Sequence, residues 1–222
     1  FIVLDDADTD EAVKGLMLAK MRNGGQACTA ANRFFVQDKV HDEFVEKLSK
    51  RMGALKVGHG ANTETTLAPL VNRKAVSSVG ELVEDAVQKG ATQLVGGSVT
   101  QGPGCYFPAT VLGNVSPEAR IVKEEVFGPV VAVVKVKDEF EALNISNKSE
   151  YGLAGYVYTK NLSRGLKVCE QLQVGMIGLN RGLVSDPSAP FGGVKQSGLG
   201  REGGYEGIDE YLEIKYVATS DF

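Results

Sequence analysis

The stretch around Cys28 has the residue types of a nucleophilic site. Gly24 and Gly25 come shortly before the cysteine, and the small residues Thr29-Ala30-Ala31 follow it. This pattern predicts that Cys28 stands at the start of a helix, where free N–H groups and the helix dipole lower the pKa of a thiol. The same N–H groups could hold a developing oxyanion. Taken alone, such a cysteine is more often a small buried apolar side chain, so both interpretations stay open.

Two further stretches have an unusual composition. The run Glu124-Glu125-Val126-Phe127-Gly128-Pro129 places two carboxylates and an aromatic ring at a rigid turn, directly before the apolar segment Val130 to Val136. The run from Pro190 to Glu202 is rich in glycine and too apolar for a simple surface linker, so it could line a pocket or form a tight connection. It lacks the residue order of a phosphate-binding loop. Each stretch alone is compatible with a purely structural role.

Composition narrows the class of protein. The chain has 222 residues, 43% of them hydrophobic, which is enough for one sizeable core. No apolar run approaches the roughly 20 residues of a membrane span, and the first residues lack the basic region of a secretory leader. The net charge of −4 is spread over both signs, so neither nucleic acid nor a membrane is an expected partner. Three widely spaced cysteines and two histidines show no metal-ligand spacing and favour a reducing cytoplasm.

The spacing of apolar residues predicts the elements that position these stretches. Helical spacing is found at Asp10 to Met21, His41 to Met52, Asn72 to Lys89 and Ser163 to Leu172. Strands are predicted at Phe1 to Leu4, Arg33 to Gln37, Thr92 to Val95, Ala109 to Leu112, Val130 to Val136, Leu153 to Tyr158 and Met176 to Leu179. This alternation implies an α/β fold: an open, mainly parallel sheet with helices on both faces.

The end of the chain predicts one more strand. From Tyr211 to Val217 apolar and charged residues alternate, so that Leu212, Ile214 and Tyr216 share one face. Such a strand is either an edge strand of the same sheet or a strand that pairs with another subunit. In this chain by itself it could also stay disordered, pair with its own domain or make a non-native contact with a neighbouring copy. We therefore expect residues 1–210 to form the catalytic domain, and residues 211–222 to form an oligomerisation strand and tail.

Together, these stretches resemble the aldehyde dehydrogenase superfamily. The resemblance rests on Gly25-Gln26-Ala27-Cys28, Glu125-Val126-Phe127-Gly128-Pro129 and the loop from Pro190 to Gly200, in that order, and runs from Phe1 to about Val217. It implies that the Cys28 thiolate attacks an aldehyde, that hydride passes from the thiohemiacetal to NAD or NADP, and that water hydrolyses the resulting thioester. It also implies that Glu125 hydrogen-bonds the nicotinamide ribose and that Phe127 packs beside the nicotinamide ring.

The resemblance also implies which parts of the family this chain lacks. In the family, the dinucleotide-binding domain, an oxyanion asparagine and a general-base glutamate all precede the nucleophile. We therefore expect an N-terminal dinucleotide-binding domain to be absent from this chain, which would be a catalytic fragment that turns over no aldehyde by itself. The parent protein is expected to be a homodimer or homotetramer without a metal ion.

Substrate class follows from a closer similarity within the superfamily. Arg22, six residues before Cys28, and the stretch around Ser197 are similar to succinate-semialdehyde dehydrogenases, in which the matching residues bind the substrate carboxylate. An arginine fork beside a thiol suits a short aldehyde that carries a carboxylate. Arg22 could instead satisfy carbonyls at a helix end, and Ser197 could bind backbone.

Two other functions remain open alternatives. The chain could belong to an enzyme for another aldehyde, such as glutarate semialdehyde or an aliphatic aldehyde. A non-catalytic structural relative, comparable to a lens crystallin, is the alternative from a different class. The intact residues Cys28, Glu125 and Phe127 argue against that second alternative.

Overall fold

The computed structural model describes residues 1–98 and 102–220. Its helices are α1 (Thr9–Met21), α2 (Asp38–Gly53), α3 (Arg73–Gln88), α4 (Arg120–Lys123), α5 (Glu139–Asn147) and α6 (Leu162–Gln171), with short 3-10 helices η1 (Arg22–Gly25) and η2 (Glu206–Tyr211). Its strands are β1 (Ile2–Val3), β2 (Phe34–Gln37), β3 (Thr92–Val95), β4 (Thr110–Gly113), β5 (Val130–Val136), β6 (Tyr151–Gly152), β7 (Ala154–Tyr158), β8 (Met176–Leu179) and β9 (Val194–Lys195).

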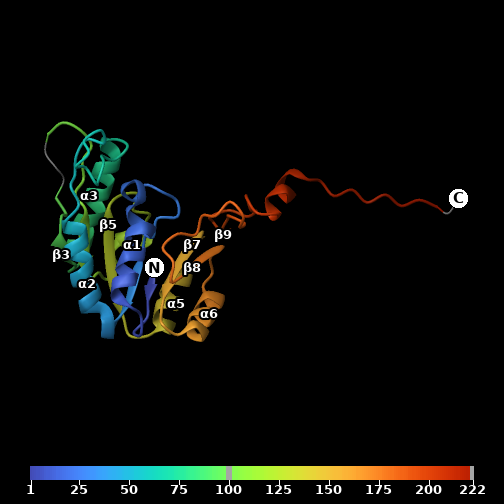
Figure 1. The fold of residues 1–222 in the computed structure, drawn as a ribbon, viewed down its shortest axis with the longest axis horizontal. Helices are drawn as coiled ribbons and strands as arrows, with labels where there is room; N and C mark the ends of the chain where they lie inside the picture. The colour runs from blue at the N-terminus through green and yellow to red at the C-terminus, as the bar shows by residue number, and fades with distance from the viewer. Residues whose placement is uncertain (99–101, 221–222) are drawn as a thin grey trace.

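One seven-stranded sheet organises the fold, as Figure 1 shows. Its strand order is β3-β4-β5-β2-β1-β7-β8, and only the edge strand β3 runs antiparallel to its neighbour. The register pairs Phe34 with Val133 and Ile2 with both Phe35 and Val157. A separate antiparallel pair, β6 with β9, brings Tyr151 opposite Lys195. The prediction of an open, mainly parallel sheet is confirmed.

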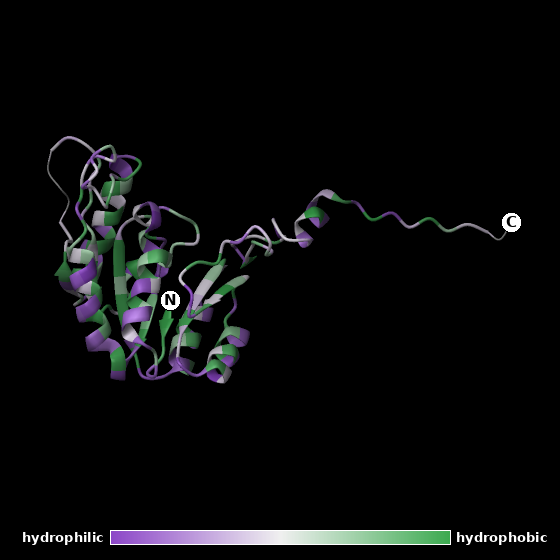
Figure 2. Ribbon diagram, in the orientation of Figure 1, coloured by the Kyte–Doolittle hydropathy of each residue, from purple (hydrophilic) through white to green (hydrophobic). Residues whose placement is uncertain are grey.

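Both faces of this sheet are buried. The even-numbered residues of β5 pack in one core with α3, α5 and α6, whereas Val131 and Val133 pack on the opposite face with α1 and α2. Because successive side chains of a strand point to opposite faces, a strand between two helical layers must be apolar throughout. Figure 2 shows this as strands that are mostly hydrophobic between helices of mixed character.

Helix ends follow their capping residues. Asp8 accepts hydrogen bonds from the backbone N–H groups of Asp10 and Glu11, so α1 begins at Thr9. Asn72 caps α3 through the N–H group of Ala75. Such caps satisfy donors that a helix leaves unpaired at its first turn. Among the described helices, none has the length and apolarity required to cross a membrane.

In this structure no strand forms from Tyr211 to Val217, so the predicted oligomerisation strand stays a prediction. Tyr211 ends η2, and residues 212–220 have no strand pairing. The side chain of Ile214 is 101% exposed, and in Figure 1 this segment leads away from the sheet. A strand needs a partner for its backbone groups, and no described strand pairs with this segment. The alternation in the sequence is therefore a pattern without a partner edge in this chain.

Candidate active site

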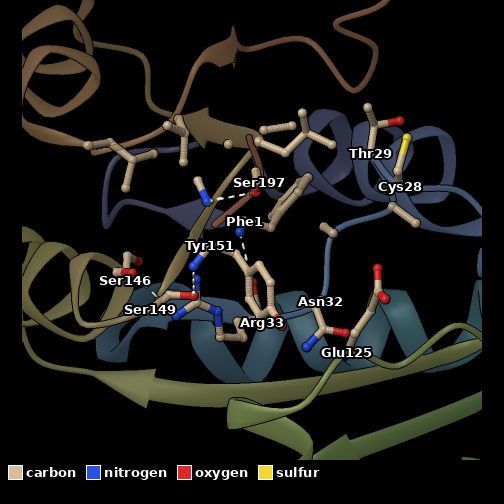
Figure 3. Close-up of a pocket in the computed structure, with 18 of the residues that line it drawn as sticks. Phe1, Cys28, Thr29, Asn32, Arg33, Glu125, Ser146, Ser149, Tyr151 and Ser197 are labelled. Carbon is tan, nitrogen blue, oxygen red and sulfur yellow. Dashed lines mark hydrogen bonds between the residues drawn. The ribbon is translucent and has the colours of Figure 1, made fainter. Parts of the chain in front are cut away.

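The main pocket lies at the amino ends of the parallel strands. It is a cavity of about 370 Å³, lined by residues that start or precede β1, β2, β5 and β7, among them Phe1, Arg33, Glu125 and Ala154. Figure 3 shows Cys28 and Glu125 on the same side of this pocket, with Asn32 beside Glu125. Ligands of open α/β sheets more often bind at the carboxyl ends of the strands. The sequence motifs therefore mark the less usual end of the sheet.

Cys28 lines this pocket from a turn, so the predicted helix start is wrong. Asn23, Gly24 and Gly25 have φ angles of 50°, 62° and 79°, and end the helical path begun by α1. The turn that follows is closed by a hydrogen bond of 2.9 Å from the N–H of Ala30 to the carbonyl of Ala27, and the next element is β2. Left-handed residues in succession stop a helix. The thiol is exposed, and the N–H of Cys28 has no acceptor within the described chain.

Tyr156 supports the turn that contains Cys28, and no sequence pattern pointed to it. Its hydroxyl donates a hydrogen bond of 2.8 Å to the carbonyl of Thr29, the residue after Cys28. Burial raises the pKa of Tyr156, so the phenol keeps the proton that it donates. In the sequence this tyrosine lies within an apolar strand, where it is indistinguishable from a core aromatic residue.

Glu125 and Phe127 lie on one irregular segment that faces the turn containing Cys28. Glu125 lines the pocket together with Cys28, and its carboxylate has no hydrogen-bond or ion-pair partner among the described residues. Phe127 is 41% exposed, although Val126 beside it is only 3% exposed. The Glu125 carboxylate and the Phe127 ring are thus both available for contact with a ligand. Phe127 itself lies outside the pocket lining.

The structure places the two predicted substrate-binding residues in different cavities. Ser197 lines the main pocket, where its Oγ accepts a hydrogen bond of 3.0 Å from the N–H of Gly152. Arg22 lines a second, much smaller cavity with Tyr156. Both cavities share Thr29 and Ala30, so the turn that carries Cys28 lies between them. The Arg22 side chain is exposed and has no hydrogen-bond or ion-pair partner in the described part of the chain.

The other thiols are less accessible than Cys28. Cys105 and Cys169 are partly buried and pack against the core that contains α3 and α6. Burial also raises the pKa of the Cys169 thiol, which lowers its thiolate fraction. Over residues 1–98 and 102–220, no cluster of three His, Cys, Asp or Glu side chains offers a metal site.

These features define a class: an α/β protein in which an exposed cysteine, on a turn that follows two glycines, lines the main pocket. Residues 1–217 match the aldehyde dehydrogenase family, and the chain belongs to that family.

Particular relatives sharpen the comparison. The chain is 50% identical over 99% of its length to a glutarate-semialdehyde dehydrogenase of Pseudomonas putida, and 49% identical over 100% to a succinate-semialdehyde dehydrogenase of Paenarthrobacter nicotinovorans. It spans 45% and 49% of the lengths of these two relatives. The crystal structure of succinate-semialdehyde dehydrogenase from Burkholderia pseudomallei superimposes with a TM-score of 0.95 at 46% identity, over 98% of this chain and 45% of that one.

Proposed function

We propose that this chain is the catalytic domain of an NAD(P)-dependent aldehyde dehydrogenase that oxidises succinate semialdehyde to succinate. One observation carries the proposal: Cys28 and Glu125 line the same pocket, and neither the Cys28 N–H nor the Glu125 carboxylate has a partner in the described chain. Groups left unpaired beside a cavity are available to a substrate and a cofactor. The names of the semialdehyde dehydrogenases to which the chain is similar support the substrate class.

The chemistry follows from the positions of these groups. The Cys28 thiolate adds to the aldehyde carbon, and the free N–H of Cys28 can donate to the oxygen that becomes negative. Glu125 and Phe127 would hold the nicotinamide end of NAD or NADP, which would supply the hydride acceptor for the carbon bound to Cys28. The thioester left on Cys28 is then hydrolysed by water, which releases succinate and returns the thiol.

Arg22 and Ser197 are proposed to bind the substrate carboxylate from the two sides of the nucleophile turn. The Arg22 guanidinium is exposed and unpaired in the described chain, so its charge is available. The Ser197 oxygen already accepts from Gly152, which leaves its hydroxyl proton free to be donated to a carboxylate. A charged hydrogen bond of this kind contributes about 1.5–3 kcal/mol.

Turnover by a chimera tests the proposal. In this Burkholderia chimera, the chain replaces the matching segment of the Burkholderia pseudomallei enzyme. We expect it to reduce NAD or NADP with succinate semialdehyde. Arg22→Ala should raise KM for that substrate about tenfold to a hundredfold, and much less for an uncharged aldehyde of similar length. Arg51→Ala, at the exposed end of α2, is the control and should change neither.

The competing substrate is glutarate semialdehyde, because relatives of both names are similar to the chain. Comparison of kcat/KM for the two semialdehydes decides between them. A higher value for glutarate semialdehyde would reassign the substrate while leaving the role of Cys28 intact. Equal effects of Arg22→Ala on charged and uncharged aldehydes would give Arg22 a structural role instead.

Oligomer formation and location are part of the same proposal. Tyr211, Ile214 and Tyr216 are each at least 83% exposed, which is unusual for apolar side chains and favours a subunit contact, in a homodimer or homotetramer. Residues 211–222 would then form the oligomerisation strand and tail. Sedimentation of the Burkholderia chimera truncated before Tyr211 should show a smaller assembly. Three unpaired cysteines favour the cytoplasm.

A further inference from the structure

The backbone of Val126, the residue between Glu125 and Phe127, is held by side chains from the segment that contains Cys28. Lys20, in the last turn of α1, donates a hydrogen bond of 3.0 Å from Nζ to the carbonyl of Val126. The N–H of Val126 donates to Oδ1 of Asn32 at 2.5 Å, and Nδ2 of Asn32 donates to the carbonyl of Glu124 at 2.8 Å. Both backbone polar groups of Val126 are therefore held from a segment about a hundred residues away along the chain.

Lys20 is an unusual residue for this place. Its side chain is fully buried at 0% exposure, and it has no carboxylate within ion-pair distance in the part of the chain that the structure describes. Burial lowers the pKa of Lys20 to about 7, and the nearby charge of Glu125 only partly opposes that shift. A buried ammonium is costly, and a methionine or leucine would fill the same space at lower cost. Packing alone therefore does not account for a lysine here.

The two segments also touch through their backbones. A β-carbon added to Gly25 would lie 2.2 Å from the carbonyl oxygen of Gly128, so only glycine allows this approach. Asn32 lies four residues after Cys28, and Figure 3 shows it next to Glu125. The turn that carries Cys28 and the turn that carries Glu125 are thus fixed to each other by Lys20, Gly25 and Asn32.

We propose that Lys20 and Asn32 are positioning residues that fix Glu125 and Phe127, the cofactor-contacting residues, relative to the nucleophile Cys28. This inference rests on the proposed function, because it assigns the clamped turn to cofactor binding. Hydride transfer requires the nicotinamide and the carbon bound to sulfur to meet at short distance, and errors of about 1 Å are costly in rate. The hydrogen bonds of Lys20 and Asn32, called the clamp, join the two turns directly. They therefore fix the distance between Cys28 and the pair Glu125 and Phe127.

Two variants remove the clamp while keeping side-chain volume. Lys20→Met removes the ammonium, and Asn32→Leu removes the bonds to Val126 and Glu124. Lys14→Met is the matched control, because Lys14 lies on the same helix, is exposed and pairs only with Glu11. In the chain itself, amide exchange over residues 124–128 should accelerate about threefold to tenfold for the two clamp variants, since each loses a hydrogen bond. The control should exchange at the rate of the unmutated chain.

Cofactor affinity then separates positioning from packing. In the Burkholderia chimera, the Kd of NADH or NADPH, followed by nicotinamide fluorescence, should rise about threefold to tenfold in Lys20→Met and Asn32→Leu, while KM for the semialdehyde stays within twofold. Faster exchange with an unchanged cofactor Kd would overturn the positioning role, and so would unchanged exchange. A chimera that binds the cofactor but oxidises no semialdehyde would contradict the proposed function alone, because the Kd values of the variants still decide the clamp.

Discussion

The two ends of the same parallel sheet treat their charged groups in opposite ways. At the carboxyl ends, Arg164 bonds Asp5 at 2.5 Å, Glu139 at 2.6 Å and Gln37 at 3.2 Å, so its charge is fully paired. At the amino ends, Arg22, Glu125 and the thiol of Cys28 have no partner among the described residues, and Lys20 is buried with a single backbone acceptor. The ion pairs at the carboxyl ends stabilise the fold, whereas the unpaired and buried polar groups at the amino ends lower its stability.

This difference indicates which end of the sheet holds the candidate site. Partnered charges close the carboxyl ends, which are the usual ligand end of an open α/β sheet. The pocket therefore forms at the other end, where the segments before β1, β2, β5 and β7 leave space. Unpaired polar groups in native proteins cluster where a ligand completes them. Three variants break or sharpen this contrast, in order of decreasing effect.

Lys20→Met should produce the largest change, seen in the pH dependence of stability. The folded protein releases the Lys20 proton near pH 7, whereas the unfolded chain keeps it up to about 10.5. Between these values the unfolded state binds more protons, so the free energy of unfolding rises with pH, by up to about 1.4 kcal/mol per unit. The unmutated chain should therefore gain about 2 kcal/mol relative to Lys20→Met between pH 7 and pH 9.

Urea unfolding at several pH values measures this difference, since other titrating groups cancel between the two chains. Lys14→Met, whose lysine is exposed, should follow the unmutated chain. Parallel curves for Lys20→Met and the unmutated chain would mean that the buried lysine is not perturbed, and the contrast between the two ends of the sheet would lose its main support.

Arg164→Met should have the second largest effect, at the opposite end. We expect a loss of about 1–2 kcal/mol at pH 7, below the value for a fully buried pair because these side chains stay 21–38% exposed. The hydrogen bonds and charge of Arg164 lower the pKa of Asp5 and of Glu139. Groups with a lowered pKa contribute stability above their ordinary pKa and lose it as the pH falls through the lowered value.

The difference between the unmutated chain and Arg164→Met should therefore shrink as the pH falls below about 4. Alkylation of Cys28 by iodoacetamide, read by mass spectrometry, should be the same in both chains at pH 7. A changed rate at Cys28 would show that the two ends of the sheet are coupled and would contradict their separation.

Tyr156→Phe should have the smallest effect, confined to the nucleophile turn. It removes one hydrogen bond to the carbonyl of Thr29, worth about 1 kcal/mol, so kcat of the Burkholderia chimera should fall about fivefold. Tyr158→Phe is the matched control, because Tyr158 lies in the same strand and its hydroxyl has no hydrogen-bond partner in the described chain. Equal kcat values for the two variants would contradict a role for the Tyr156 hydroxyl in catalysis.

The spacing of apolar residues predicted most of the fold but little of the geometry of the candidate site. The apolar run of β5 and the alternating elements around it predicted a two-sided parallel sheet, because burial on both faces leaves a local signature. No helix starts at Cys28, because the chain forms a single turn at residues 27–30 and then enters β2, and the small residues after Cys28 are compatible with either structure. The segment from Tyr211 to Val217 forms no strand in this chain, because pairing depends on a partner edge and not on the segment itself.

The candidate site residues also differ in whether the sequence alone could reveal them. Cys28 and Glu125 stand in local motifs, so sequence could single them out. Tyr156 acts through a hydroxyl that meets Thr29 only in the folded chain, over a separation of 127 residues. Lys20 left a weak signal, a lysine on the apolar face of α1 together with Val13 and Leu16, both 2% exposed or less. Contacts between distant segments have no periodic signature, which is why these residues emerged from the structure.

Trapping the covalent intermediate tests the central claim most directly. The Burkholderia chimera is mixed with succinate semialdehyde and its cofactor, quenched in acid during turnover, digested and examined by mass spectrometry. The account predicts a succinyl group on the peptide that contains Cys28, released by hydroxylamine as a thioester is, and none on Cys105 or Cys169. Turnover without an adduct at Cys28, together with undiminished activity of Cys28→Ser, would contradict it.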